Sequence, residues 1–216
     1  MRTMVFFPLR NAQELARKHD DFLPIHVRFH RDNRMKKDDS MTEREERRDT
    51  DHYIAQDGSF WGVREAVPAD LNDLVTLDDI TKPVPWGRDA IAGFIGCVPG
   101  VFVLYPTNRA GMTLGGPVGF VIARWLGDEC EIMSIGVHPQ YRRRGLGRML
   151  METVRRTTLA HGKTSWILEV REYNTPALSL YKSIGFLEVG KRRDYYIDTG
   201  EAAILMRGDT TNGDPQ

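Results

Sequence analysis

The turn at residues 142–147 carries the side chains of this sequence that are best suited to binding an anion. It reads Arg-Arg-Arg-Gly-Leu-Gly, and Arg142 to Arg144 supply charge and fork-shaped donors. Gly145 and Gly147 lack the Cβ atoms that would hold a phosphate away from the backbone. A helix that starts here adds unpaired N–H groups and the positive end of its dipole. The turn could therefore hold a pyrophosphate, although a basic loop that only caps a helix would have the same pattern.

The segments on either side of the turn predict a strand before it and a helix after it. Alternation is expected to place Met133, Ile135 and Val137 on one face of the strand and Ile132, Ser134 and Gly136 on the other. Pro139 ends the strand because it has no N–H to donate. From Leu146 to Thr157, apolar residues recur at helical spacing.

Three polar side chains further along could also do chemistry, but each has a structural explanation. Glu169 lies in an otherwise apolar strand, where it either faces a cleft or pairs with Arg171 or another arginine. Tyr181 lies on the apolar face of a helix, a pattern that is more typical of a core tyrosine. Asn174 precedes that helix, and capping alone would explain it.

Taken together, these segments resemble the GCN5-related N-acetyltransferases (GNATs), and among them the RimI type, the ribosomal-protein alanine N-acetyltransferases. The resemblance covers roughly residues 60–207. It is carried by Arg142-x-x-Gly145-x-Gly147 together with Pro85-Trp86, Ile135-Gly136-Val137-His138-Pro139, Arg143-Arg144-Gly145-Leu146-Gly147-Arg148, Leu168-Glu169-Val170-Arg171, Asn174, Leu180-Tyr181, Gly185-Phe186 and Arg192-Arg193-Asp194-Tyr195-Tyr196.

The resemblance implies a role for each of these segments. Acetyl-CoA, released as CoA, would contact Ile135, Gly136, Val137, Arg142, Arg143, Arg144, Gly145, Leu146, Gly147, Arg148 and Asn174. Glu169 matches the general base, and Tyr181 matches the general acid that protonates the coenzyme thiolate. Trp86, Tyr195 and Tyr196 correspond to segments that line the acceptor-peptide groove.

The resemblance also implies the fold, an α/β GNAT fold with a mixed, mostly antiparallel central sheet flanked by helices. The sheet would split between the fourth and fifth strands, where pantetheine pairs with exposed backbone like an added strand. Gly136 suits the bulge that accompanies the split. The patterns along the chain agree, since they predict the order β-α-α-β-β-β-α-β-α-β-β.

The chain is predicted to contain one domain with an appendage. From residue 30 to residue 51, 15 of 22 residues are charged, so residues 1–58 are expected to form a disordered N-terminal extension. This extension could be dispensable, a gene-model artefact or a docking arm. The acetyltransferase domain is placed at residues 59–207, and a polar tail at residues 208–216.

Composition gives no support to several other classes of function. Thirty basic residues balance 30 acidic ones, which gives no support to direct nucleic-acid binding. No stretch approaches the ~20 apolar residues that span a membrane. Cys97 and Cys130 lack metal-ligand spacing, so no metal is expected, and inert thiols suit a reducing cytoplasm.

The function that these observations favour is transfer of acetyl from acetyl-CoA to a protein N-terminus, directly and in a ternary complex. The motifs contain no cysteine that could carry the acetyl group. The resemblance implies an N-terminal alanine of a ribosomal protein as the acceptor. Alternatives are a GNAT that acts on lysine side chains or a small-molecule amine, and a non-catalytic acyl-CoA-binding module. The presence of both Glu169 and Tyr181 argues against the module.

Overall fold

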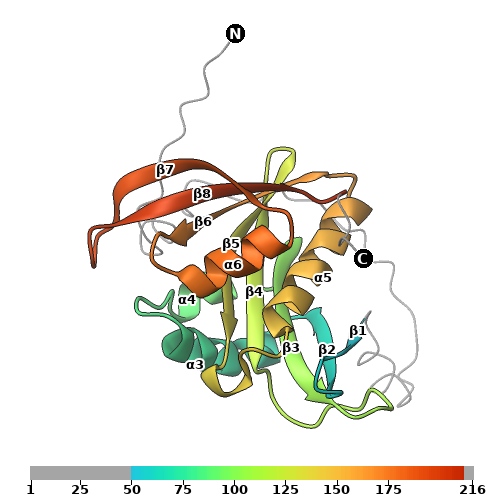
Figure 1. Cartoon of the computed structure of the whole chain (residues 1–216). Helices are drawn as coiled ribbons and strands as arrows, with labels where there is room; N and C mark the ends of the chain where they lie inside the picture. The colour runs from blue at the N-terminus through green and yellow to red at the C-terminus, as the bar shows by residue number, and fades with distance from the viewer. Residues whose placement is uncertain (1–49, 212–216) are drawn as a thin grey trace, which may run out of the picture.

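The computed structural model describes residues 50–211. Figure 1 shows the arrangement of the helices and strands in this part of the chain. They are β1 (Asp51–Ile54), β2 (Phe60–Glu65), η2 (Pro68–Asp70), α3 (Leu71–Thr81), α4 (Arg88–Ala92), β3 (Pro99–Thr107), β4 (Gly119–Leu126), β5 (Glu129–Val137), η3 (Pro139–Tyr141), α5 (Leu146–Ala160), β6 (Ser165–Arg171), α6 (Thr175–Ser183), β7 (Leu187–Tyr196) and β8 (Glu201–Asp209). Apart from β1 and the two 3-10 turns, this is the order that the sequence predicted.

All eight strands form one sheet, in the order β1-β2-β3-β4-β5-β6-β8-β7. Within residues 50–211, only β5 and β6 run parallel, and every other neighbouring pair is antiparallel. Helices α5 and α6 cover one face of the sheet, and α3 and α4 cover the other (Figure 1). The predicted fold class, a mixed and mostly antiparallel sheet flanked by helices, is confirmed.

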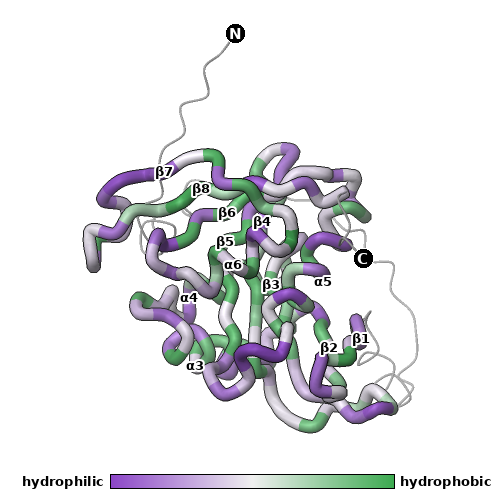
Figure 2. The backbone as a smooth tube through the Cα atoms, in the orientation of Figure 1, coloured by the Kyte–Doolittle hydropathy of each residue, from purple (hydrophilic) through white to green (hydrophobic). Residues whose placement is uncertain are grey.

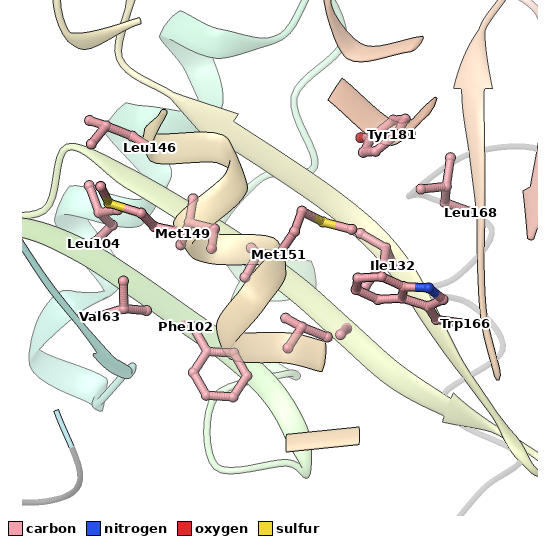
Figure 3. Packing of buried hydrophobic residues seen from close by; sticks show 14 of the residues in the cluster. Val63, Phe102, Leu104, Ile132, Leu146, Met149, Met151, Trp166, Leu168 and Tyr181 are labelled. Atoms are coloured by element: carbon pink, nitrogen blue, oxygen red, sulfur yellow. The ribbon is translucent and has the colours of Figure 1, made fainter. Parts of the chain in front are cut away.

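Each face of the sheet has its own apolar layer. Under α5, Leu146, Leu150 and Val154 are buried against β2 to β5, and Tyr181 and Trp166 continue the layer toward β6 (Figure 3). Under α3 and α4, Leu74, Leu77 and Phe94 pack on strands β3 and β4. Hydrophobic segments therefore follow the central strands, while the connecting turns are mostly hydrophilic (Figure 2). The two layers hold β5 firmly from both sides.

The sheet begins before the domain boundary that the sequence predicted at residue 59. Strand β1 pairs with β2 from Asp51 opposite Val63 to Ile54 opposite Phe60. The Tyr53 hydroxyl lies 2.8 Å from Thr153 Oγ1 on α5, and Ala55 is buried in the core. A four-residue strand beside a charged segment is too short to show a period of two. The rest of the predicted extension, residues 1–49, lies outside the described residues.

The sheet also runs past residue 207, where the sequence placed the end of the domain. Strand β8 continues to Asp209, and the Thr210 N–H donates to the Thr164 carbonyl at 2.7 Å. The Thr210 carbonyl accepts a hydrogen bond from Arg155 at 2.9 Å. The predicted tail therefore contributes its first residues to the domain, and residues 212–216 lie outside the described part.

Two shortened chains test this boundary. A chain that starts at residue 50 keeps β1 and should melt at the temperature of the full chain. A chain that starts at residue 59 loses β1 and the contacts of Tyr53 and Ala55, so it should melt lower, by about 2–4 °C for each kcal/mol lost. Circular-dichroism melts of both chains measure the difference. Equal melting temperatures would mean that β1 adds nothing to the domain.

Candidate active site

The sheet splits between β5 and β6, which are the fourth and fifth strands that the sequence predicted. The two strands pair only from Glu129 opposite Ser165 to Ile132 opposite Leu168. Beyond Ile132, β5 stays paired with β4 alone. The strands then border a groove of about 810 Å³. The groove gives a ligand access to the exposed edge of β5.

The backbone of β5 faces the split at alternate residues. His138 N–H donates to the Val118 carbonyl at 2.8 Å, and the register places Val137 opposite Gly119. In an antiparallel ladder, residues next to a hydrogen-bonded pair direct their N–H and C=O groups away from that partner strand. Val137 and Ile135 therefore direct these groups toward the split, whereas Gly136 directs its own toward β4. An extended chain in the groove could pair with Ile135 and Val137.

The prediction that Gly136 forms the bulge is wrong, because the register shifts at Met133 instead. Ile132 pairs with Ala123 and Ser134 pairs with Ile122, which leaves Met133 as the extra residue. The shift turns Met133 toward the α3 layer, while Ile135 and Val137 pack toward α5. These three side chains consequently do not share the one face that simple alternation predicted.

Gly136 has a different role, which is to make room for its neighbours. A Cβ at this position would lie 2.6 Å from Thr81 Oγ1 and 2.8 Å from a ring carbon of Phe120. Both distances are shorter than a real contact allows, so the end of α3 can approach β5 only over a glycine. The sequence could not show this, because it depends on a contact between distant segments.

The turn before α5 has the shape of an anion site. Arg143 and Gly145 both have left-handed backbones, with φ of 66° and 82°. Among the described residues no side chain caps α5 at Gly145. The Arg148 N–H donates to the Gly145 carbonyl, and the N–H groups of Leu146 and Gly147 keep their capacity for a ligand. A Cβ on Gly145 would meet nothing within 4 Å, which shows that the approach to these groups is open. Gly147, by contrast, lets α5 pack on α6, since its Cβ would lie 3.0 Å from Leu180.

The four arginines at this turn have different surroundings. Arg142 Nε donates to the Val137 carbonyl at 2.9 Å and ties the turn to the end of β5. Arg144 lies 3.3 Å from Asp57, and Arg148 donates to Ser183 Oγ at 2.9 Å. Within residues 50–211, Arg143 has no ion pair or hydrogen bond through its side chain, and it is exposed. Its guanidinium is the one most available to a phosphate.

Glu169 lies on the face of β6 that is opposite α5 and α6, and it borders the groove. Arg192 Nη1 lies 2.6 Å from its carboxylate, and the Tyr195 hydroxyl is hydrogen-bonded to it. Burial, with this carboxylate in addition, raises the pKa of Tyr195. Glu169 thus forms an ion pair with an arginine, Arg192, and it also borders the groove. Arg171 pairs instead with Asp198, at 2.7 Å.

Tyr181 reaches the groove from the opposite face of the sheet. It lies on α6, is 5% exposed, and packs in the same layer as Leu168 and Trp166 (Figure 3). Burial, followed by the nearby Tyr196, raises the pKa of Tyr181. The phenol therefore keeps its proton at neutral pH. Asn174 caps α6, since its Oδ1 accepts the Ala177 N–H at 3.3 Å, and it also borders the groove.

The three predicted acceptor-side aromatics come together at the groove. Trp86 approaches from the loop between α3 and α4, and Tyr195 and Tyr196 approach from the end of β7. The two tyrosine rings pack edge to face with centroids 5.2 Å apart. Burial and the charge of Glu169 raise the pKa of Tyr196 to about 12. All three side chains thus form part of one wall.

Two charged residues in this wall were not predicted as part of the site. Asp78 is fully buried on α3 and accepts the Trp86 N–H, and Lys82 lies 3.0 Å from its carboxylate. The sequence does contain a sign of this pair. Asp78 lies among the apolar positions of a helix, and a carboxylate there needs a buried partner. Lys82, one helical turn later, is such a partner.

The comparisons with known proteins agree with this geometry. Residues 71–186 match the model of the acetyltransferase (GNAT) family. The chain belongs to this family. It is 43% identical over 112 residues to N-alpha-acetyltransferase RimI of Mycobacterium tuberculosis, a match that covers 51% of this chain and 68% of that relative. It is 40% identical over 94 residues to the ribosomal protein bS18-alanine N-acetyltransferase of Escherichia coli strain K12, covering 43% and 64%.

A solved structure extends the similarity of this GNAT acetyltransferase to most of its domain. The crystal structure of the ribosomal-protein-S18-alanine N-acetyltransferase from Escherichia coli superposes with a TM-score of 0.60 and 30% identity, covering 72% of this chain and 97% of that one. Residues 50–211 contain no cluster of side chains that could hold a metal ion. No helix in the same range is long and apolar enough to cross a membrane.

Substitution of Gly145 separates coenzyme binding from backbone strain. Gly145→Ala should weaken acetyl-CoA binding at least tenfold, because a methyl group would occupy the open approach to the α5 N–H groups. Gly162→Ala is the control, since Gly162 also has a left-handed φ, of 70°, and open space around it. Both variants should lose about 1–2 kcal/mol of stability. Calorimetric titration and thermal melts measure both effects, and equal coenzyme affinity in the two variants would contradict the assignment.

Proposed function

We propose that this protein transfers acetyl from acetyl-CoA to the α-amine of a protein N-terminus. The names of its relatives favour an N-terminal alanine of a ribosomal protein as the acceptor. With such an acceptor, the protein would act in the cytoplasm. The observation that carries the proposal is that one groove passes through the split in the sheet. It is bordered by Tyr181 from one face and by Glu169 from the other. Donor and acceptor can therefore meet from opposite sides.

The donor side fits acetyl-CoA. The uncapped start of α5, the open approach over Gly145 and the exposed Arg143 suit a pyrophosphate. The backbone groups of Ile135 and Val137 that face the split suit an extended pantetheine. When bound there, acetyl-CoA supplies an activated thioester. Val137 N–H is placed to donate a hydrogen bond to an oxygen in the split and to stabilise negative charge on it.

The acceptor side provides a base and the thiolate side provides an acid. Glu169 accepts a proton from the acceptor amine, directly or through water. Its contacts with Arg192 and Tyr195 fix the carboxylate in the groove. An α-amine titrates near ~8, so partial assistance from the carboxylate is sufficient. Tyr181 holds a proton that it can give to the leaving thiolate.

A panel of acceptors tests the proposed function. Peptides with a free N-terminal alanine should be acetylated faster than the same peptides with a blocked N-terminus and an internal lysine, and faster than polyamines. Mass spectrometry locates the acetyl group, and initial rates rank the acceptors. Faster acetylation of lysine or polyamine would replace the proposed acceptor with another amine. The absence of transfer to every amine, with acetyl-CoA bound, would favour a non-catalytic module.

Two substitutions separate the base from the acid. Glu169→Gln should lower kcat most near pH 7, where the amine is largely protonated, and higher pH should restore part of the rate because solvent removes that proton. Tyr181→Phe should lower kcat by a factor of about ten to a thousand and leave coenzyme affinity little changed. The measurement is a pH–rate profile with saturating peptide.

Matched controls lie outside the groove. Glu172→Gln also breaks an ion pair, with Lys191, and Tyr173→Phe removes the hydroxyl of a tyrosine that is 77% exposed. Both controls should keep the wild-type profile. If Glu169→Gln and Tyr181→Phe behave like these controls, the two residues have only structural roles.

A further inference from the structure

Lys82 places a largely buried ammonium group in the acceptor wall of the groove. Its side chain is 15% exposed and borders the groove directly after α3. The nitrogen is hydrogen-bonded to Ser134 Oγ on β5. It also lies over the rings of Trp86 and Phe120, 5.4 and 5.1 Å from their centroids. None of the roles assigned above to the groove residues requires a cation at this point.

Asp78 anchors this cation from behind. Its carboxylate is 3.0 Å from the Lys82 nitrogen, and the Asp78 side chain is only 1% exposed. The same carboxylate accepts the Trp86 N–H, so the pair ties the loop that carries Trp86 to α3. Because Asp78 is buried and Lys82 borders the groove, the pair presents its positive end to the acceptor. Burial lowers the pKa of Lys82, and Asp78 opposes this shift.

The contact with Ser134 holds the charge against the part of β5 that borders the split. Ser134 follows the bulge and belongs to the part of β5 that does not pair with β6. Under the proposed function, the acetyl group lies along this segment, and the acceptor amine must approach it from the side of Lys82 and Glu169. A fixed positive charge nearby disfavours the ammonium form of the amine and lowers its pKa.

The other charged groups around Lys82 are already balanced. On the same face, Glu131 of β5 pairs with Arg124 of β4 at 2.6 Å. From β6, Glu169 pairs with Arg192 of β7 at 2.6 Å, and Arg171 pairs with Asp198. The phenols of Tyr195 and Tyr196 stay neutral, since burial raises the pKa of each. Carboxylates that could attract an ammonium ion are therefore each held by an arginine.

We propose that Lys82, anchored by Asp78, is a positioning residue that holds the acceptor wall against β5 and biases the bound acceptor amine toward its neutral, nucleophilic form. This inference rests on the proposed function for the place of the amine. A free α-amine titrates near ~8, so that only about a tenth of it is neutral at pH 7. Lowering its pKa by about one unit would raise the neutral fraction roughly fivefold.

The variant that tests this idea changes both members of the pair. Asp78→Asn with Lys82→Met removes both charges and leaves an amide oxygen for the Trp86 N–H. Lys82→Met alone would leave the buried Asp78 carboxylate without its partner, which would strongly destabilise the fold. Lys82→Arg is the conservative control, because it keeps the charge beside Asp78. Thermal melts and acetyl-CoA titration establish that each variant is folded and binds its coenzyme.

The readout is kcat against pH at saturating acetyl-CoA and alanine peptide. In the double variant, the acid limb of the kcat profile should move to higher pH by about half to one unit. Its kcat should be about three- to fivefold lower than that of wild type at pH 7, and the difference should disappear by about pH 9.5. Lys82→Arg should keep the wild-type limb. A folded double variant with an unmoved limb overturns the proposal, even if its KM for peptide rises, since a purely structural role would give that result.

A second measurement needs no variant. The acid limb of the wild-type kcat profile should lie below the pKa of the same peptide's free amine, titrated by NMR. A limb at or above that pKa overturns the proposal. If wild type prefers lysine or polyamine acceptors, the proposed function fails, and the same comparison on the preferred amine still decides the role of Lys82.

Discussion

The end of the parallel pairing between β5 and β6 is the constraint on which the rest of this site depends. After Ile132, β5 has one partner strand where an interior strand has two. Backbone N–H and C=O groups that are shielded from water need hydrogen bonds. The Val137 carbonyl already accepts a hydrogen bond from Arg142 Nε at 2.9 Å. The backbone groups that remain at Ile135 and Val137 face the split, where an extended ligand could pair with them.

The split also explains why the candidate acid and base come from opposite layers. Tyr181 belongs to the apolar layer under α5 and α6, where burial keeps its proton in place. Glu169 projects from the other face of β6, where Arg192 Nη1 lies 2.6 Å from its carboxylate. An unbroken sheet would separate these two side chains completely. Because β5 and β6 diverge, both side chains border one groove.

Most of the fold followed from local patterns, and the exceptions depend on distant contacts. Helix α5 and strands β3 to β6 could be predicted because periodicity and turn residues act within a few positions. The bulge at Met133 could not, since it is a shift in the pairing of β5 with β4 that no local pattern marks. The family resemblance placed Glu169 and Tyr181 at the groove, but only the structure shows Arg192 and Tyr195 as the partners of Glu169. The pair of Asp78 and Lys82 had a helical spacing, yet nothing local pointed it toward Ser134.

That pair suggests why the acceptor wall is built on charge where an apolar contact would be simpler. Replacing a buried ion pair with well-packed apolar residues is often neutral or stabilising, so stability alone gives little reason to keep one. Here Asp78 accepts the Trp86 N–H and forms an ion pair with Lys82, and Lys82 is hydrogen-bonded to Ser134, so the loop, α3 and β5 are linked by one set of polar contacts. Such contacts fix a position more narrowly than apolar packing does. The wall that carries Trp86 is therefore held against the split strand, with the ammonium group of Lys82 at the border of the groove.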